Sequence, residues 1–124
     1  MAGKLYIVGT PIGNLLDMSP RAIETMNNCD FIAAEDTRVT VKLLNHFNIK
    51  KPMISYYRHN TEANGKVIID KILSGENCVL VSDAGMPAIS DPGEQLVRDC
   101  ADLGIDVYVV PGPSAVVAAL AVSG

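Results

Sequence analysis

Short apolar runs alternate along the chain with segments whose apolar residues recur every three or four positions. Such runs are typical of buried strands, and the longer recurrence is typical of amphipathic helices. The runs predict five strands: Lys4–Val8, Phe31–Ala34, Pro52–Tyr56, Asn77–Ser82 and Asp106–Val110. Because a helical segment follows each strand, the pattern predicts an α/β fold with a five-stranded, mainly parallel sheet and helices on both faces.

Residues that favour helix ends mark the predicted helices. Ser19 stands before Pro20, which suits an N-cap followed by proline at the first helical position. Asp91 is expected to cap a later helix, and Gly75 and Gly104 are expected to end two others in the left-handed conformation. Val39 shares the helical period of Leu43, Leu44 and Phe47. The apolar residues expected to face the sheet are Ala22, Ile23, Met26, Leu43, Leu44, Phe47, Leu96, Val97, Cys100 and Leu103.

The segment Ser114–Val122 is apolar on every side of a helix. A helix of this kind favours burial all round. No polar tail follows it in the sequence. We therefore expect residues 1–124 to form one N-terminal domain of a longer protein, with a C-terminal domain outside this chain, or a partner subunit to cover the helix.

Composition narrows the class of protein. Hydrophobic residues make up 48% of the 124 residues, and the apolar runs are too short to span a bilayer. Three widely spaced cysteines and two histidines suggest neither a disulfide framework nor a metal site. The N-terminal residues enter a strand pattern at once, without the layout of a signal peptide. We expect a soluble, cytoplasmic protein with no metal and no membrane contact.

The charge is unevenly distributed. The formal net charge is −4, yet the window from Thr37 to Lys66 holds six basic residues against one acid, Glu62. This asymmetry suits a surface that faces a polyanion, and it suits an ordinary solvated surface equally well.

Glycine, proline and polar residues follow four of the predicted strands. In an open parallel sheet, ligands bind beyond the carboxyl ends of the strands. Any single Gly/Pro turn is more often structural than functional, but these four loops share one edge of the sheet. The spacing of Gly9 and Gly13 does not match a dinucleotide fingerprint, and no P-loop is present, so the ligand is expected to lack a polyphosphate. The loops are Gly9–Asn14, Glu35–Arg38, Ser82–Pro87 and Pro111–Ala115.

Four motifs resemble one known family across essentially the whole chain. They are Val8–Leu15, Ala33–Arg38, Val81–Gly93 and Pro111–Ala115, and the stretch Ser82–Gly93 is the most specific. Together they resemble the ribosomal RNA small subunit methyltransferase I family of the tetrapyrrole methylase superfamily. The resemblance implies S-adenosyl-L-methionine as cofactor, 2′-O-methylation of a cytidine ribose in 16S ribosomal RNA, the 30S subunit as a partner, and a homodimer. It also implies a two-domain protomer with the cofactor between the domains, so that this chain by itself is expected to be inactive.

The motifs assign candidate residues to three roles. Glu35 or Asp36 is the candidate base for the ribose hydroxyl, and Arg38 is the candidate partner of a phosphate or alkoxide. Arg38, Lys42 and His46 recur every four residues along one stripe of a helix. By position, the resemblance implies a cofactor site at Pro11, Ser82, Asp83, Ala84, Gly85, Ile89, Ser90, Ser114 and Ala115. The RNA-binding candidates are Arg38, Lys42, His46, Lys50, Lys51, Arg58 and His59.

Three other functions stay open from the sequence. A methyltransferase of the same superfamily could act on a tetrapyrrole or on a modified protein residue. The chain could also bind cofactor or RNA without turnover. A nucleotide-dependent oxidoreductase is disfavoured by the glycine spacing.

Overall fold

The computed structural model describes residues 1–89 and 92–124. Five strands form one sheet in the order β3-β2-β4-β1-β5, and every pairing is parallel. The predicted α/β fold is confirmed, and each observed strand lies within its predicted range. The strands are β1 (Leu5–Val8), β2 (Phe31–Ala34), β3 (Met53–Ser55), β4 (Cys78–Val81) and β5 (Val107–Val110).

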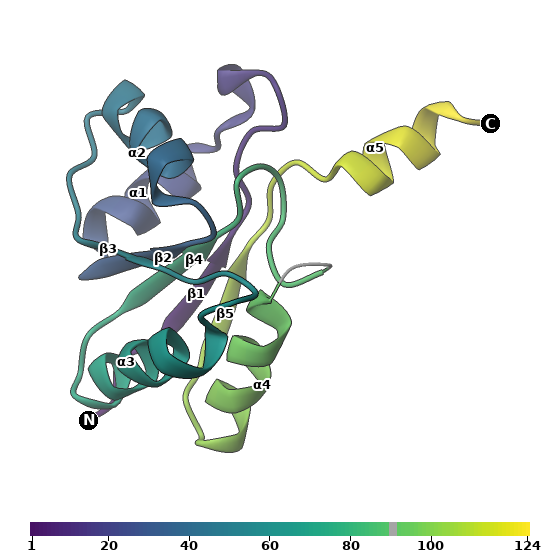
Figure 1. Cartoon of the computed structure of the whole chain (residues 1–124). Coiled ribbons are helices and arrows are strands. Elements are labelled where there is room, and N and C mark those ends of the chain that lie inside the picture. Colours follow the sequence, from purple (N-terminus) through teal and green to yellow (C-terminus); the bar gives the residue numbers. More distant parts are fainter. Residues whose placement is uncertain (90–91) are drawn as a thin grey trace.

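The helices form two layers, one on each face of the sheet (Figure 1). Helices α1 (Pro20–Asn28) and α2 (Thr37–His46) cover one face, where Met26 and Leu44 pack in a buried cluster with Val8, Ile32 and Val79. A short 3-10 helix, η1 (Leu15–Asp17), precedes α1. Predicted Ser19 is the N-cap of α1, where its Oγ accepts a hydrogen bond from the Ala22 backbone N–H at 3.0 Å.

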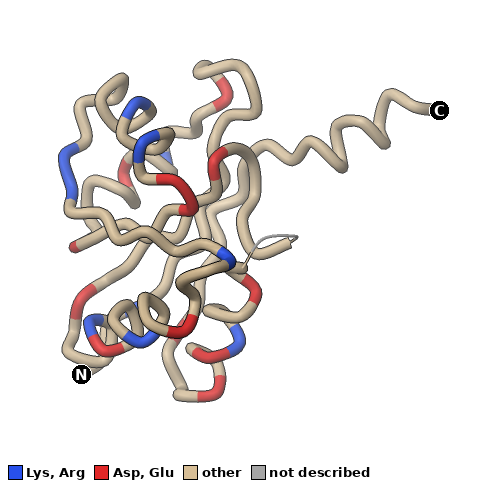
Figure 2. The backbone as a smooth tube through the Cα atoms, in the orientation of Figure 1, with Lys and Arg blue, Asp and Glu red and all other residues tan. Residues whose placement is uncertain are grey.

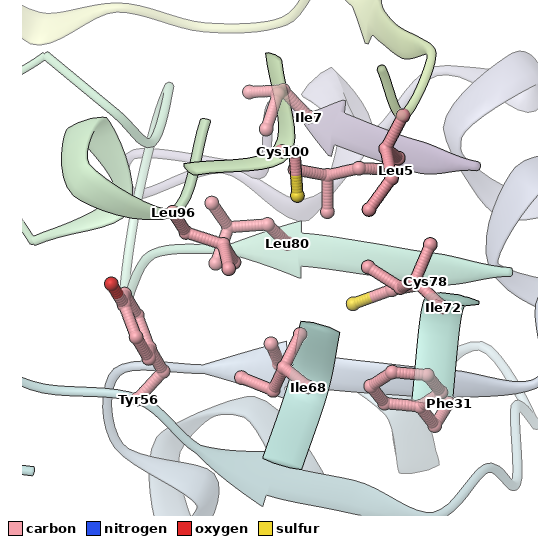
Figure 3. Close-up of a cluster of buried hydrophobic side chains, with 12 residues drawn as sticks. Leu5, Ile7, Phe31, Tyr56, Ile68, Ile72, Cys78, Leu80, Leu96 and Cys100 are labelled. Carbon is pink, nitrogen blue, oxygen red and sulfur yellow. The ribbon is translucent and has the colours of Figure 1, made fainter. Parts of the chain in front are cut away.

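Helices α3 (Thr61–Leu73) and α4 (Gly93–Asp102) cover the opposite face. Figure 3 shows the core on this side, with Ile68 and Ile72 of α3 facing Phe31 and Cys78 of the sheet. Parallel strands covered on both faces are apolar throughout, and every residue of β2 and β4 is buried.

The prediction that Leu103 faces inward is wrong, and Val39, an apolar residue of the helical period, is also exposed. The α2 helix presents Thr40 and Leu44 to the sheet, so Val39 lies beside that stripe and is 41% exposed. Leu103 is 54% exposed because it is the C-cap of α4, next to Gly104, whose φ of +73° turns the chain toward β5. The prediction that Asp91 caps a helix concerns a residue outside the described ones.

The apolar helix α5 (Ala115–Val122) has no buried residue. It leads away from the sheet rather than packing on either face (Figure 1). Its apolar composition favours burial, but the described residues do not cover it.

The order of the strands creates a switch point between β1 and β4. These neighbours hydrogen-bond to each other, but β1 leads to α1 on one face and β4 leads to α4 on the other. The carboxyl edge of the sheet at such a switch point is the usual ligand position in open α/β sheets.

Candidate functional site

The loops after β1 and β4 are joined by backbone hydrogen bonds. The N–H of Thr10 donates to the Gly85 carbonyl at 3.0 Å, and the N–H of Gly85 donates to the Thr10 carbonyl at 3.0 Å. Gly85 has a φ of +80°, a conformation that glycine adopts without a steric penalty. The pair fixes the two loops of the switch point relative to each other.

The loop after β5 contacts the same place. A Cβ built on Gly9 would lie 2.6 Å from the Gly112 Cα, so neither position accommodates a side chain without movement. The Gly9 N–H also donates to the Val110 carbonyl at 3.1 Å. Three loops, after β1, β4 and β5, therefore meet at one point of the rim.

The loop after β2 is attached to the β4 loop through Asp83. Oδ1 of Asp83 accepts a hydrogen bond from the Asp36 N–H at 3.1 Å. Asp36 is the N-cap of α2 and accepts from the Arg38 N–H at 3.0 Å. The Arg38 guanidinium in turn donates from Nε and Nη2 to the two Asp36 oxygens, at 3.1 and 3.0 Å. These hydrogen bonds hold the pKa of Asp36 below its ordinary value and raise the pKa of Arg38.

Two hollows flank Asp83. The first, which we call the Tyr57 hollow, has a volume of about 510 Å³ and is lined by Glu35, Asp36, Thr37, Arg38, Ser55, Tyr57 and Asp83. The second, the Pro11 hollow, has a volume of about 380 Å³. Its walls come from the β1 loop (Pro11, Gly13, Asn14, Leu15), from α2 (Val39, Thr40, Lys42, Leu43, His46) and from Asp83.

The structure brings most of the predicted cofactor residues to this rim. Pro11 and Asp83 line the same hollow, and Ser82 is nearly buried, with its hydroxyl donating to the Ala84 carbonyl at 3.0 Å. Ser114 is the N-cap of α5, where its Oγ accepts from the Val117 N–H at 3.4 Å.

Other predicted cofactor residues are not gathered at the hollows. Ile89 is 71% exposed, and Ala115 is exposed at the start of α5. Neither lines the hollows beside Asp83. The prediction for Ser90 falls outside the described residues.

The predicted RNA-binding residues lie at the surface, and all except the half-buried Lys51 are exposed. In Figure 2, basic segments mark α2 and the connection from α2 to β3 on the same side of the sheet. Lys42 and His46 line the Pro11 hollow, whereas Arg38 lines the Tyr57 hollow. The predicted stripe along α2 therefore borders both hollows.

Ser55 and Tyr57 were missed as site residues. The rule that selected the other loops also applies to these residues, because β3 is parallel to its neighbour β2 and ends at the same edge of the sheet. The sequence after this short strand gives little indication of a site, because a tyrosine such as Tyr57 is often part of the core.

Within residues 1–89 and 92–124, no group of three or more His, Cys, Asp or Glu residues is arranged to hold a metal ion. None of the helices in that part of the chain combines the length and the apolar character needed to cross a bilayer. The three cysteines are buried free thiols, and burial raises the pKa of Cys29 and of Cys100 to about 11.

A family model described as "Tetrapyrrole (Corrin/Porphyrin) Methylases" matches residues 4–124. The chain belongs to the tetrapyrrole methylase family. Among solved structures, its fold is similar to uroporphyrin-III-C-methyltransferase from Thermus thermophilus, with a TM-score of 0.72 at 21% identity over 96% of this chain and 50% of that chain.

The chain is also similar in sequence to curated members of this family. Ribosomal RNA small subunit methyltransferase I of Synechocystis sp. is 54% identical over 98% of this chain and 44% of the relative. The protein of the same name from Thermotoga maritima is 53% identical over 98% of this chain and 55% of the relative. The tetrapyrrole methylase chain described here thus spans about half the length of these relatives.

Proposed function

We propose that this chain is the N-terminal, cofactor-binding part of an S-adenosyl-L-methionine-dependent methyltransferase that acts on small-subunit ribosomal RNA. The observation that carries the proposal is the junction of the β1, β4 and β5 loops at the switch point, with the basic stripe of α2 beside it. A ligand at the junction and a polyanion over α2 would be in contact.

The residues at the junction suit this cofactor. S-adenosyl-L-methionine carries an apolar adenine, a ribose diol and an amino acid, and it has no phosphate. Asp83 and the backbone groups of Ser82–Gly85 can accept hydrogen bonds from ribose hydroxyls or from an ammonium group. Thr10 provides a more specific sign, because among the described residues its Oγ1 is the one buried side-chain polar atom without a hydrogen-bond partner. An unsatisfied buried hydroxyl is costly, and we propose that a small rearrangement on cofactor binding gives it a partner.

The residues also suit transfer to a hydroxyl acceptor. The cofactor supplies an electrophilic methyl group, and the protein positions the acceptor and removes its proton. Asp36 is a weak proton acceptor because the Arg38 guanidinium and N–H hold its pKa low. Glu35 lines the same hollow, and we propose it as the base. Arg38, held by Asp36, is placed to stabilise negative charge on the acceptor or on a neighbouring phosphate.

Ribosomal RNA is favoured over a tetrapyrrole as the acceptor. The relatives at about half identity are named ribosomal RNA small subunit methyltransferase I, whereas the uroporphyrin methyltransferase is related at only 21% identity. The basic stripe Arg38, Lys42 and His46 supports the same choice. We extend the proposal to a cytidine 2′-hydroxyl in 16S RNA within the 30S subunit, and to a cytoplasmic location.

We propose that a longer protein completes the cofactor site. The relatives are about twice as long, so we propose that residues 1–124 form one wall of the cofactor cleft and that a C-terminal domain forms the other. The exposed apolar residues Val116, Val117 and Leu120 of α5 support burial by that domain or within a homodimer. Sedimentation of the full-length protein measures the oligomeric state directly.

Calorimetric titration tests the cofactor assignment. S-adenosyl-L-methionine and its demethylated product are titrated into the chain and into the full-length protein. Tight binding by the full-length form, with weaker binding by residues 1–124, supports the proposal, and no binding by the full-length form overturns it. Thr10→Val is a matched variant, because it replaces an unpaired hydroxyl by a methyl group of similar shape. We expect it to fold at least as stably as the parent and to bind the cofactor more weakly.

A further inference from the structure

The Tyr57 hollow has an aromatic wall that the proposed cofactor site does not use. Tyr56 and Tyr57 follow β3 in succession and differ sharply in burial. Tyr56 is 2% exposed and packs against Gly65 of α3, whereas Tyr57 is 41% exposed and lines the hollow. An exposed aromatic ring at the carboxyl edge of a parallel sheet is available to a ligand.

Tyr57 is also held in place by its backbone. Its N–H donates to Oδ1 of Asn60 at 2.7 Å, and its carbonyl accepts from the Asn60 N–H at 3.0 Å. Asn64 Nδ2 fixes the preceding turn by donating to the Ser55 carbonyl at 2.6 Å. The His59 ring lies edge-on to the Tyr57 ring, with the centroids 6.0 Å apart. These hydrogen bonds fix the backbone that carries the Tyr57 ring at the edge of the hollow.

The lining of the hollow is also rich in carboxylates. Glu35, Asp36 and Asp83 line the same hollow, and Asp36 is neutralised in part by its bidentate contact with Arg38. Carboxylates repel phosphate but accept hydrogen bonds from amino groups, including the exocyclic amine of a base. The hollow is thus unsuited to a phosphate, and its volume of about 510 Å³ is ample for a planar ring.

Positive charge is present as well, on Arg38 in the lining of the hollow and on Arg58 beside Tyr57. Arg38 has 88% of its side chain exposed, and Arg58 is exposed one residue beyond Tyr57. Aromatic rings flanked by basic side chains are the common arrangement for single-stranded nucleic acid, in which bases stack and phosphates follow the basic groups.

We propose that the Tyr57 hollow holds one unstacked, amino-bearing nucleobase of the RNA acceptor, with the Tyr57 ring as the stacking platform and the carboxylate of Asp36, which is not the candidate base, as the partner of the amino group. The inference rests on the proposed RNA methyltransferase function and adds a residue that selects the substrate. Asn60 and Asn64 act through Tyr57 as positioning residues.

The test uses the full-length protein with fluorescently labelled single-stranded oligocytidine and oligouridine of equal length. These bases differ at position 4, where cytosine has an amine and uracil a carbonyl. We expect Tyr57→Ala to weaken oligocytidine binding by about 5- to 150-fold, the range found when a stacking ring is removed. Tyr57→Phe should retain most of the affinity and Tyr57→Leu should not. The preference for oligocytidine over oligouridine should shrink in Tyr57→Ala.

Two controls make the result specific. Tyr108→Ala removes a tyrosine of similar exposure (43%) on β5, which does not line the hollow, and should leave RNA binding unchanged. The dependence of affinity on salt should keep its slope in Tyr57→Ala, because no charge is removed. Calorimetric binding of S-adenosyl-L-methionine checks that each variant is folded.

The outcomes separate this inference from the function beneath it. If the parent protein methylates RNA and Tyr57→Ala binds oligocytidine as the parent does, the base site is overturned and the methyltransferase proposal stands. Equal loss in Tyr57→Phe and Tyr57→Ala would assign the effect to the hydroxyl and overturn stacking. If the parent protein binds neither cofactor nor RNA, both proposals are overturned.

Discussion

Gly9 and Gly112 come into backbone contact where β1 and β5 lead into their loops. A Cβ on Gly112 would lie 2.8 Å from the Gly9 Cα and 2.9 Å from its carbonyl carbon and oxygen. The atoms it would meet are backbone atoms, which cannot move away by changing a rotamer. This contact holds the β5 loop against the switch point between β1 and β4.

We therefore expect Gly112→Ala to destabilise the fold by about 1–3 kcal/mol, the usual cost of overpacking. The measurement is urea unfolding followed by circular dichroism.

Gly104 is the comparison position, because a Cβ there meets nothing within 4 Å and only its φ of +73° opposes a side chain. Asparagine tolerates that conformation, so Gly104→Asn should be milder than Gly104→Ala, whereas Gly112→Asn should be at least as harmful as Gly112→Ala. Equal stability of Gly112→Ala and the parent would contradict the close approach.

Glu35 and Asp36, the two acidic residues that follow β2, should have different roles. In the full-length enzyme, Glu35→Gln should lower kcat by about 10²- to 10⁴-fold, the usual contribution of a general base, with cofactor binding unchanged. Asp36→Asn should affect KM for RNA more than kcat, because Asp36 caps α2 and positions Arg38. Steady-state kinetics distinguish the two, since Glu35→Gln should lower kcat and Asp36→Asn should mainly raise KM. Glu24→Gln, on the exposed surface of α1, is the control. A larger loss of kcat in Asp36→Asn than in Glu35→Gln would reverse the assignment.

The sequence predicts the fold well because its main signals are local. Each apolar run from Leu5 to Val110 is long enough for a strand, and Ser19, Gly75 and Gly104 mark helix ends by backbone preferences that do not depend on tertiary contacts. The prediction for Leu103 was wrong because a helical period alone does not fix the residue at which a helix ends, and Leu103 is the C-cap of α4.

The candidate site was only partly predictable for a different reason. The rule for parallel sheets places the Gly9, Glu35 and Ser82 loops at one edge. The contacts among them depend on strand order, which the sequence does not give. Only the order β3-β2-β4-β1-β5 puts the Asp36 N–H within reach of Asp83 and joins Thr10 to Gly85. Tyr57 was missed because an aromatic residue beside a weak strand resembles core until its exposure is known.

The buried cysteines should make the fold sensitive to alkaline pH. Burial raises the pKa of Cys29 from the ordinary value of 9.0 to about 11, and does the same for Cys100. Between these values the unfolded chain releases protons that the native state retains, so stability falls as pH rises from 9 toward 11. Urea midpoints measured from pH 8 to 10.5 should show this fall, and it should be smaller in Cys29→Ala.

Thiol labelling tests the burial of the cysteines directly. Native protein at pH 8 should react slowly with a thiol reagent, and all three thiols should react once the protein is unfolded. Rapid labelling of the native protein would contradict the burial.

Lys42 and Arg38, two basic residues of the stripe along α2, should contribute unequally to RNA binding. Lys42 lines the Pro11 hollow with no ion-pair partner among the described residues, whereas the charge of Arg38 is offset by Asp36 at 3.0 Å. In the full-length protein, Lys42→Ala should lower the slope of log affinity against log salt by about 0.7, the value for one phosphate contact on a single strand. Arg38→Ala should lower it less. Lys66→Ala is the matched control, since Lys66 is exposed on α3, across the sheet from α2 (Figure 1). If Lys42→Ala and Lys66→Ala leave the same slope as the parent, the stripe is an ordinary solvated surface and the RNA must approach from another side.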